Sequence, residues 1–336
     1  MRKKLLLTGA ALLIVGATAC DNTGLAYGDA NSIIAVMTPE LWEDVSDDVR
    51  TVLQPTVRTV RNEKKFTVTY QDPMGDYWGD LRRFRQLLLV GTAEDPWMQA
   101  ALDKADDPIT EPGIHQVTDI WARDQLATLI LLPSGGGAPD VVRHLDAIIE
   151  MYDEQFRQWV QRRMYVSSGI DTALADTLYL EAGFSLMLPE VYRWELQDSV
   201  YIFRNDQPDP SELIRQIAVT WTSPVPVDLQ PEDILAWREA IVSTHYSEAQ
   251  AQILDDAVAG PLDYRGNYAY EIAAEWRNPP ERGWPAGGPF ITRAIVCENQ
   301  ARMYLVDAWL YAPAKEKYEY MIQLSTILDT FRCGVA

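Results

Sequence analysis

The sequence is poor in the residues that bind metals and carry out nucleophilic catalysis. Its three histidines are His115, His144 and His245, and no two of them have a spacing that places two imidazoles on one metal. No Gly-x-Ser-x-Gly elbow is present to expose a serine nucleophile, and no aspartate loop follows the calcium-binding pattern. We therefore expect no metal and no cofactor, and no catalytic residue can be named from the sequence.

Basic residues are scarce relative to acidic ones. The chain has 29 lysines and arginines against 49 aspartates and glutamates, and its formal net charge is −20. So acidic a surface repels phosphate backbones and anionic lipid headgroups. We therefore expect no nucleic-acid partner, and a membrane contact must come from an anchor rather than from a basic patch.

Long apolar runs are confined to the N-terminus. A basic head, residues 1–4, precedes an apolar stretch over residues 5–19, which ends in small residues. This layout is typical of a secretory signal peptide. The stretch has 15 residues, whereas a helix that crosses a bilayer needs roughly 20. We expect residues 1–19 to be removed, which leaves 26 basic and 49 acidic side chains after the loss of Arg2, Lys3 and Lys4.

The residues before Cys20 resemble the bacterial lipobox, in which the cysteine thiol receives a diacylglyceryl group and becomes the new N-terminus. Ala17 and Ala19 leave room for a peptidase, although Ala17 departs from leucine, the commonest residue there. An ordinary signal peptide followed by a chance cysteine is the alternative. The sequence thus predicts a palmitate-bearing lipoprotein of the cell envelope, anchored through Cys20 outside the cytoplasm. It does not distinguish the inner from the outer membrane.

The length of 336 residues predicts two domains. Hydrophobic periodicity predicts an α+β fold, each domain being a mainly antiparallel or mixed sheet with packed helices. The expected boundaries are a signal peptide at 1–19, a flexible tether at 20–31, an N-terminal α/β-type domain at 32–165, a linker at 166–177 and a C-terminal α+β domain at 178–333.

Local patterns predict the main elements. In the first half we expect strands at residues 33–37, 66–70, 86–90 and 126–132, a helix that begins at Pro39 with Thr38 as N-cap, and a long helix from Pro139. In the second half we expect strands at 184–188, 199–204, 214–222, 268–276, 290–297 and 304–311, and helices at 231–245 and 314–331.

Several motifs of the second half are similar to those of a known family. They are the residues at 183–189 (GFSLMLP), 201–204 (YIFR), 270–271 (YE) with Trp276, 288–290 (GPF) and 311–313 (YAP). They resemble the domain of unknown function 4837 family, whose members are lipoproteins of similar length. The resemblance implies a lipid anchor and no particular activity. Residues 184–204 also resemble the opening hairpin of PsbP-like α-β-α sandwich domains.

Two of the 11 tryptophans lie in glycine-rich loops rather than on periodic apolar stretches. Trp78 follows Gly75, and Trp284 lies beside Arg282 and Gly283. An exposed ring in such a loop could stack on a sugar or a peptide, so Trp78, Trp284 and Arg282 are candidate ligand-binding residues. The alternative is that the loop rings fold back onto the body of the protein.

The two cysteines other than Cys20 are Cys297 and Cys333. Cys297 ends one predicted strand, and an antiparallel strand followed by a helix of similar length returns the chain to the same end of the sheet. Export to an oxidising compartment permits a disulfide between them. Two unpaired thiols are the alternative.

These observations favour a non-catalytic envelope lipoprotein that binds a protein partner or a small ligand. The partner would be an envelope protein or a glycan. The competing hypothesis is an envelope hydrolase that acts on a glycan or an ester through acidic residues, because a pair of acids can meet in the fold without any sequence signal.

Overall fold

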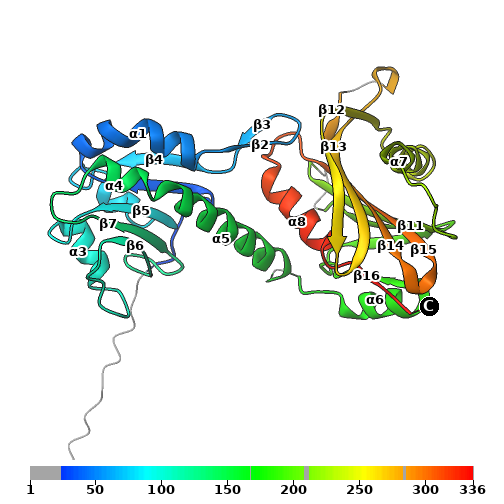
Figure 1. Cartoon of the computed structure of the whole chain (residues 1–336), viewed down its shortest axis with the longest axis horizontal. Helices are drawn as coiled ribbons and strands as arrows, with labels where there is room; N and C mark the ends of the chain where they lie inside the picture. The colour runs from blue at the N-terminus through cyan, green and yellow to red at the C-terminus, as the bar shows by residue number, and fades with distance from the viewer. Residues whose placement is uncertain (1–23, 167, 208–211, 283–284, 336) are drawn as a thin grey trace, which may run out of the picture.

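The computed structural model describes residues 24–166, 168–207, 212–282 and 285–335, and it shows two α+β domains (Figure 1). The predicted fold class is therefore confirmed. Helix α5 (Leu145–Val166) starts on the sheet of the first domain and extends to the second, so it spans both (Figure 1). None of the helices in the described ranges is long and apolar enough to cross a membrane.

The first domain is a five-stranded sheet covered on both faces. Its order is β4-β1-β5-β7-β6, in which β6 alone is antiparallel to its neighbour. The strands are β1 (Ser32–Val36), β4 (Thr67–Gln71), β5 (Gln86–Gly91), β6 (Gly113–Thr118) and β7 (Leu126–Leu131). The central strand β5 reads QLLLVG and is buried throughout, as expected of a parallel strand between two layers.

Helices cover the two faces of this sheet. The helices α1 (Pro39–Leu53), α4 (Ala138–Val142) and α5 bury one face together with Ile33 and Ala35, while α3 (Pro96–Leu102) buries the other with Ile34 and Val36. Thr38 caps α1 as predicted, because its hydroxyl accepts a hydrogen bond from Leu41 N. A short helix, α2 (Trp78–Leu81), lies between β4 and β5.

The second domain is a seven-stranded antiparallel sheet in the order β12-β13-β14-β15-β11-β10-β9. Its strands are β9 (Arg193–Gln197), β10 (Val200–Asn205), β11 (Ile214–Thr222), β12 (Ala251–Tyr264), β13 (Asn267–Arg277), β14 (Gly287–Cys297) and β15 (Arg302–Tyr311). Two 3-10 turns, η2 (Pro280–Arg282) and η3 (Glu298–Gln300), lie at strand ends.

Both faces of this sheet are also covered. Helix α7 (Pro231–His245) packs on one face, and α8 (Tyr318–Leu328), α6 (Thr172–Thr177) and the π-helical turn η1 (Leu178–Ala182) pack on the other. A small ladder of β8 (Phe184–Ser185) and β16 (Arg332–Cys333) lies at the chain end. Strand β11 shows the consequence, since Ile217 and Val219 face α8 while Ala218 faces α7.

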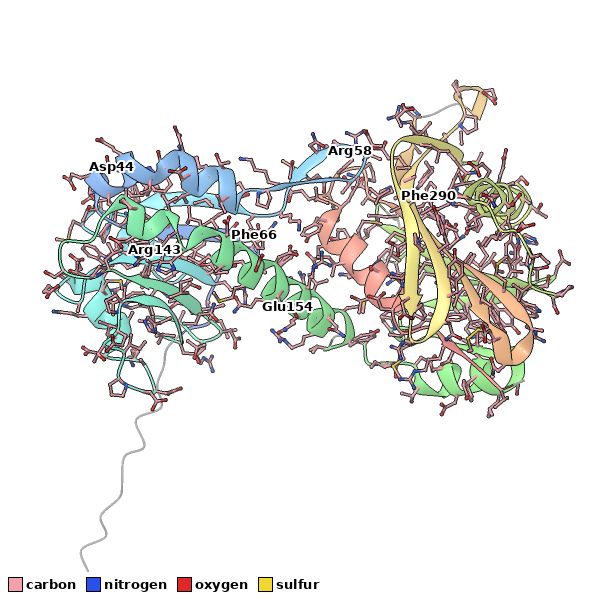
Figure 2. All side chains as sticks on the ribbon, in the orientation of Figure 1. Asp44, Arg58, Phe66, Arg143, Glu154 and Phe290 are labelled. Atoms are coloured by element: carbon pink, nitrogen blue, oxygen red, sulfur yellow. A yellow bond between two sulfur atoms is a disulfide. The ribbon has the colours of Figure 1, made fainter. Side chains whose placement is uncertain are left out.

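A hairpin of β2 (Thr56–Arg58) and β3 (Asn62–Lys64) leaves the first domain and reaches the second (Figure 1). Arg58 Nη2 lies 2.8 Å from Glu275 Oε1 of β13, and the labelled side chains of Arg58 and Phe290 in Figure 2 mark this junction. Helix α8 packs on both domains, because Tyr318 and Ile322 belong to the core of the first. The two domains therefore share a continuous apolar contact.

Three predicted segments are corrected by the structure. The helix expected from Pro139 is divided into α4 and α5, because His144 N bonds the carbonyl three residues back, Val141 O, at 3.0 Å. The helix expected at 314–331 is α8, which is shorter at both ends. The strand expected at 184–188 pairs over two residues only, and Met187 N bonds Thr330 Oγ1 instead of a strand.

The two predicted connecting segments also contain ordered structure. The prediction of a flexible tether is wrong for residues 24–31, because Ala26 N donates to Arg123 O at 2.8 Å and Tyr27 O accepts from Arg85 N at 2.8 Å. The predicted linker 166–177 contains α6, whose N-terminus is capped by the Asp171 carboxylate. Both segments are polar in composition, but their backbones find partners within the fold.

Candidate functional site: a groove along helix α5

Two adjoining cavities of about 700 and 800 Å³ lie along α5, and the smaller one is also lined by α8 of the second domain. Both are lined by Ala30, Arg85, Phe156, Trp159 and Arg163, and together we call them the α5 groove. Their volumes fall within the range of about 300–1,000 Å³ that small-molecule sites occupy, and domain interfaces are a frequent place for such sites. Figure 2 shows Glu154 on the stretch of α5 that crosses between the domains.

Aromatic rings on α5 form the apolar wall of the groove. Phe156 and Trp159 are three residues apart on one helix face, and their rings stack with centroids 6.0 Å apart. Tyr318 of α8 lies against Phe156 from the other domain, at 5.9 Å. Trp159 is only half-buried, so it offers ring surface to the groove as well as to the core.

Arg85 is the central charged residue of the groove. Its backbone N donates to Tyr27 O at 2.8 Å, which fixes it directly before β5. Its side-chain Nε is buried and has no hydrogen-bond partner among the described residues, while Nη2 lies 3.5 Å from Ala26 O. A buried N–H without a partner is costly. Arg85 also lines both cavities, so its guanidinium can donate to an anionic group bound there.

The loop of residues 119–125 forms the rim opposite α5. Asp119 and Asp124 have left-handed backbones, with φ of 58° and 61°. Gln125 holds the loop from inside, because its amide donates to Arg82 O and Phe84 O, both at 2.7 Å. Left-handed non-glycine residues are uncommon and gather at binding sites. Neither carboxylate forms an ion pair or hydrogen bond within the described part of the chain.

A salt bridge joins the domains at the side of the groove. Arg163 Nη1 lies 3.2 Å from Glu319 Oε1 of α8, and the Arg163 guanidinium stacks on Trp159 at 5.0 Å. Burial raises the pKa of Glu319 above its usual value, although Arg163 opposes the rise. This wall therefore carries a carboxyl that is protonated more readily than a surface glutamate.

A second polar network lies behind the aromatic wall. Asp153 accepts hydrogen bonds from Tyr318 Oη at 2.6 Å, Arg157 Nε at 3.0 Å and Lys65 Nζ at 3.1 Å. Burial opposes the ionisation of Asp153, but these donors outweigh it and lower its pKa. The network fixes α5 relative to α8 and so holds the groove in shape.

Of the three predicted ligand-binding residues, the structure places the side chain of Trp78 only, and it lies outside this groove. Trp78 is half-buried against the core of the first domain, where it contacts Trp121 edge-on at 5.2 Å, so its ring folds back as the alternative hypothesis expects. Trp284 and the side chain of Arg282 lie outside the described residues, as does Cys20. No group of three metal-binding side chains occurs in the described ranges.

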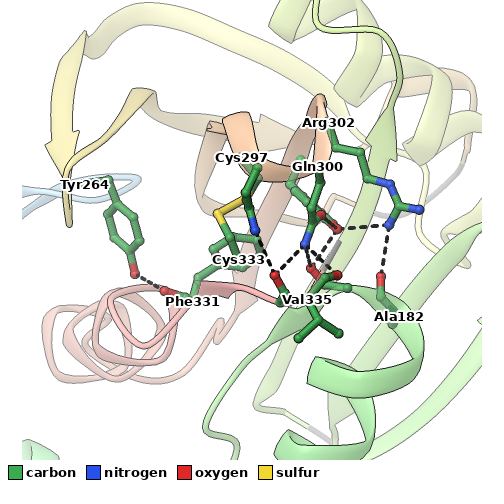
Figure 3. Close-up of a disulfide and its surroundings, with 12 residues drawn as sticks. Ala182, Tyr264, Cys297, Gln300, Arg302, Phe331, Cys333 and Val335 are labelled. Carbon is green, nitrogen blue, oxygen red and sulfur yellow. Dashed lines mark hydrogen bonds between the residues drawn. A yellow bond between two sulfur atoms is a disulfide. The ribbon is translucent and has the colours of Figure 1, made fainter.

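Cys297 and Cys333 are joined in a disulfide, with Cα atoms 5.7 Å apart (Figure 3). The bond connects the end of β14 to β16. Beside it, Gln300 Nε2 donates to Gly183 O at 2.7 Å and Gly334 O at 3.0 Å. The chain end is thus held to the sheet by covalent and hydrogen bonds together.

Family models match both halves of the chain. Residues 26–165 match a domain of unknown function, DUF8532, and residues 171–330 match another, DUF4837. The C-terminal half belongs to the DUF4837 family. The α5 groove is therefore lined from both matched regions, since α5 precedes the DUF4837 domain and Glu319 lies within it.

The other comparisons add little to this assignment. Two solved structures, the Ran-binding protein Mog1p of Saccharomyces cerevisiae and a mutant of protein Mog1, are each 10% identical to 46% of this chain, with a TM-score of 0.31. The matches cover 91% and 92% of those chains. No curated protein matches the chain. The resemblance of the DUF4837 domain to PsbP-like domains stays a prediction.

The residues of the groove carry little signal that sequence reasoning could use. Trp159 lies on a periodic apolar stretch and was expected in the core, whereas Arg85 directly precedes a buried strand. Asp119 and Asp124 are two carboxylates among 49 acidic residues. The one available hint was the position of Arg85, a charged residue at the entrance of an otherwise apolar run.

Proposed function

We propose that this chain is a lipid-anchored protein of the bacterial cell envelope that binds a small ligand, without catalysis, in the α5 groove. Arg85, which lines both cavities and whose Nε has no hydrogen-bond partner among the described residues, carries the proposal. The signal-like N-terminus and Cys20 support the location. The disulfide is compatible with an oxidising compartment.

A thermal-shift screen of small metabolites with purified residues 21–336 tests the binding. A true ligand should raise Tm of the wild-type protein and of Arg82→Met, but not of Arg85→Met. Arg82 is the matched control, because it is exposed, precedes Arg85 by three residues and does not line the groove. A screen without any stabilising compound, or equal binding by Arg85→Met, would contradict the proposal. Turnover of glycan or ester substrates by the same preparation would favour the competing hydrolase.

A further inference from the structure

We propose that the ligand of the α5 groove is a short, unblocked apolar peptide, whose carboxylate is bound by arginine and whose ammonium is bound by aspartate. The inference rests on the proposed function and adds the chemical class of the ligand. The evidence for this class is that arginines and aspartates line the larger cavity together and form no ion pairs with one another in the described structure.

The positive side of the site consists of Arg85 and Arg162. Arg85 presents a buried Nε without a partner, and the exposed Arg162 forms no ion pair within the described residues. Guanidinium groups bind carboxylates in a planar, bidentate arrangement, which a peptide C-terminus satisfies. An anionic group is therefore the expected occupant of this side.

The negative side consists of Asp119 and Asp124. Their loop is adjacent to Arg85, since Leu126 N donates to Arg85 O at 2.8 Å. Both carboxylates are exposed, and neither forms an ion pair with Arg85 in the described structure. Opposite charges that lie in one cavity and do not neutralise each other suit a ligand that brings both a carboxylate and an ammonium. A phosphate or a simple carboxylic acid would meet the aspartates with like charge.

The wall between these charges is apolar. Phe156, Trp159 and Leu126 line the larger cavity beside the charged groups. An extended peptide advances roughly 3.3–3.6 Å per residue, so two or three residues separate its end charges by a distance that a cavity of about 800 Å³ accommodates. The side chains of such a peptide would then contact the aromatic rings of α5.

Calorimetric titration with four forms of one tripeptide tests this assignment. The probes are Ala-Leu-Ala with free ends, its N-acetyl form, its C-terminal amide and the doubly blocked form. The free peptide should bind, and each blocked end should weaken binding by about 10-fold or more, because a charge-assisted hydrogen bond is lost. Equal binding of free and blocked peptides, or no binding of any of the four, overturns the inference.

Variants assign each end of the peptide to its residues. In Asp119→Asn/Asp124→Asn the free peptide should bind as weakly as the acetylated one, and acetylation should have no further effect. Asparagine tolerates the left-handed backbone, so this variant keeps the loop. In Arg85→Met the preference for the free carboxylate over the amide should disappear. In Arg162→Gln, where the arginine is exposed, the same preference should become smaller. Preferences that persist in these variants overturn the inference.

The outcome also separates this inference from the proposed function. If the thermal-shift screen finds a different chemical class that requires Arg85, the peptide assignment fails and the proposed function stands. If no compound and no peptide binds, both fail.

Discussion

At the scale of single residues, a fully buried ion pair joins helix α7 to the sheet of the second domain. Arg238 and Asp307 are both fully buried, and Arg238 Nε lies 2.8 Å from Asp307 Oδ1. Tyr246 Oη donates to Asp307 Oδ2 at 2.6 Å, and the Thr292 hydroxyl donates to Oδ1. The Arg238 guanidinium also lies 3.8 Å from the Phe290 ring centroid. The pair holds α7 on the sheet.

The Asp307→Asn variant should destabilise the protein strongly. Asparagine keeps the shape but leaves the Arg238 charge buried without a counter-charge, which costs about 3–5 kcal/mol. Urea unfolding followed by tryptophan fluorescence measures the loss. Arg193→Gln is the control, because it breaks an ion pair whose arginine side chain is 67% exposed, and it should cost less than about 1 kcal/mol. A loss below that limit for Asp307→Asn would show that the charge pair does not stabilise the fold.

At the scale of elements, the β2–β3 hairpin acts as the N-terminal cap of a helix in the other domain. Helix α8 has no cap from its own N-cap side chain, Lys317. Instead, the buried carboxylate of Glu63 accepts from Lys317 N at 2.6 Å and Tyr318 N at 3.3 Å. The negative charge also suits the positive end of the helix dipole.

The Glu63→Gln variant should therefore loosen the contact between the domains. Loss of the charge at the helix end and of one strong acceptor should reduce stability by roughly 1–3 kcal/mol. The rate of amide hydrogen exchange at the first turn of α8 should rise as this stability is lost. Glu43→Gln on the exposed face of α1 is the control and should change neither quantity. If exchange at α8 stayed at its wild-type rate, the hairpin would not be its cap.

The disulfide fastens a second element, the chain end after α8. The Cys297→Ala/Cys333→Ala variant opens a loop with a sequence separation of 36 residues, which should cost roughly 3–4 kcal/mol by the chain-entropy model. Alkylation and intact-mass measurement before and after reduction should show the paired thiols in the wild-type protein. Cys20→Ala is the matched control for loss of a cysteine outside the pair. Two free thiols in the unreduced wild-type protein would contradict the pairing.

The elements that could be predicted are those whose pattern is local. Strand β11 and helix α7 have the predicted bounds, because β11 contains β-branched and aromatic residues around a buried centre and α7 begins at a proline. Strands β9 and β12 were missed, since they are exposed edge strands without a clear alternation. Their pairing comes from the neighbouring strand, so their own sequence carries little of the signal.

The candidate site could not be predicted for a related reason. It is formed by contacts between distant parts of the chain, such as Arg163 with Glu319, which are 156 residues apart. The disulfide was predicted from a strand and a helix of similar length, but α8 has only 11 residues, so the chain after it, including β16, completes the return to Cys297. No comparable argument brings Arg85 to the end of α5, because that depends on how α5 packs along the sheet of the first domain.

At the scale of the whole molecule, the proposed lipid anchor determines where the protein resides. The Cys20→Ala variant should leave the membrane fraction and lose incorporation of labelled fatty acid, because the apolar anchor is gone. Cell fractionation and acyl labelling measure the two effects. The Cys297→Ala/Cys333→Ala variant is the control, since it keeps Cys20. Unchanged membrane retention without label would show that another part of the chain provides the attachment.

If Cys20 carries the proposed lipid anchor, the ordered segment before β1 limits how far the protein can stand from the membrane. Gly24 O already accepts a hydrogen bond from Arg123 N at 3.0 Å, so an acyl group on Cys20 would leave a leash of only a few residues, roughly 14 Å at full extension. Arg123 belongs to the loop that carries Asp119 and Asp124, so this rim of the groove lies next to Gly24. With the proposed lipid anchor on Cys20, so short a leash would keep the groove in the thin layer of solvent next to the bilayer.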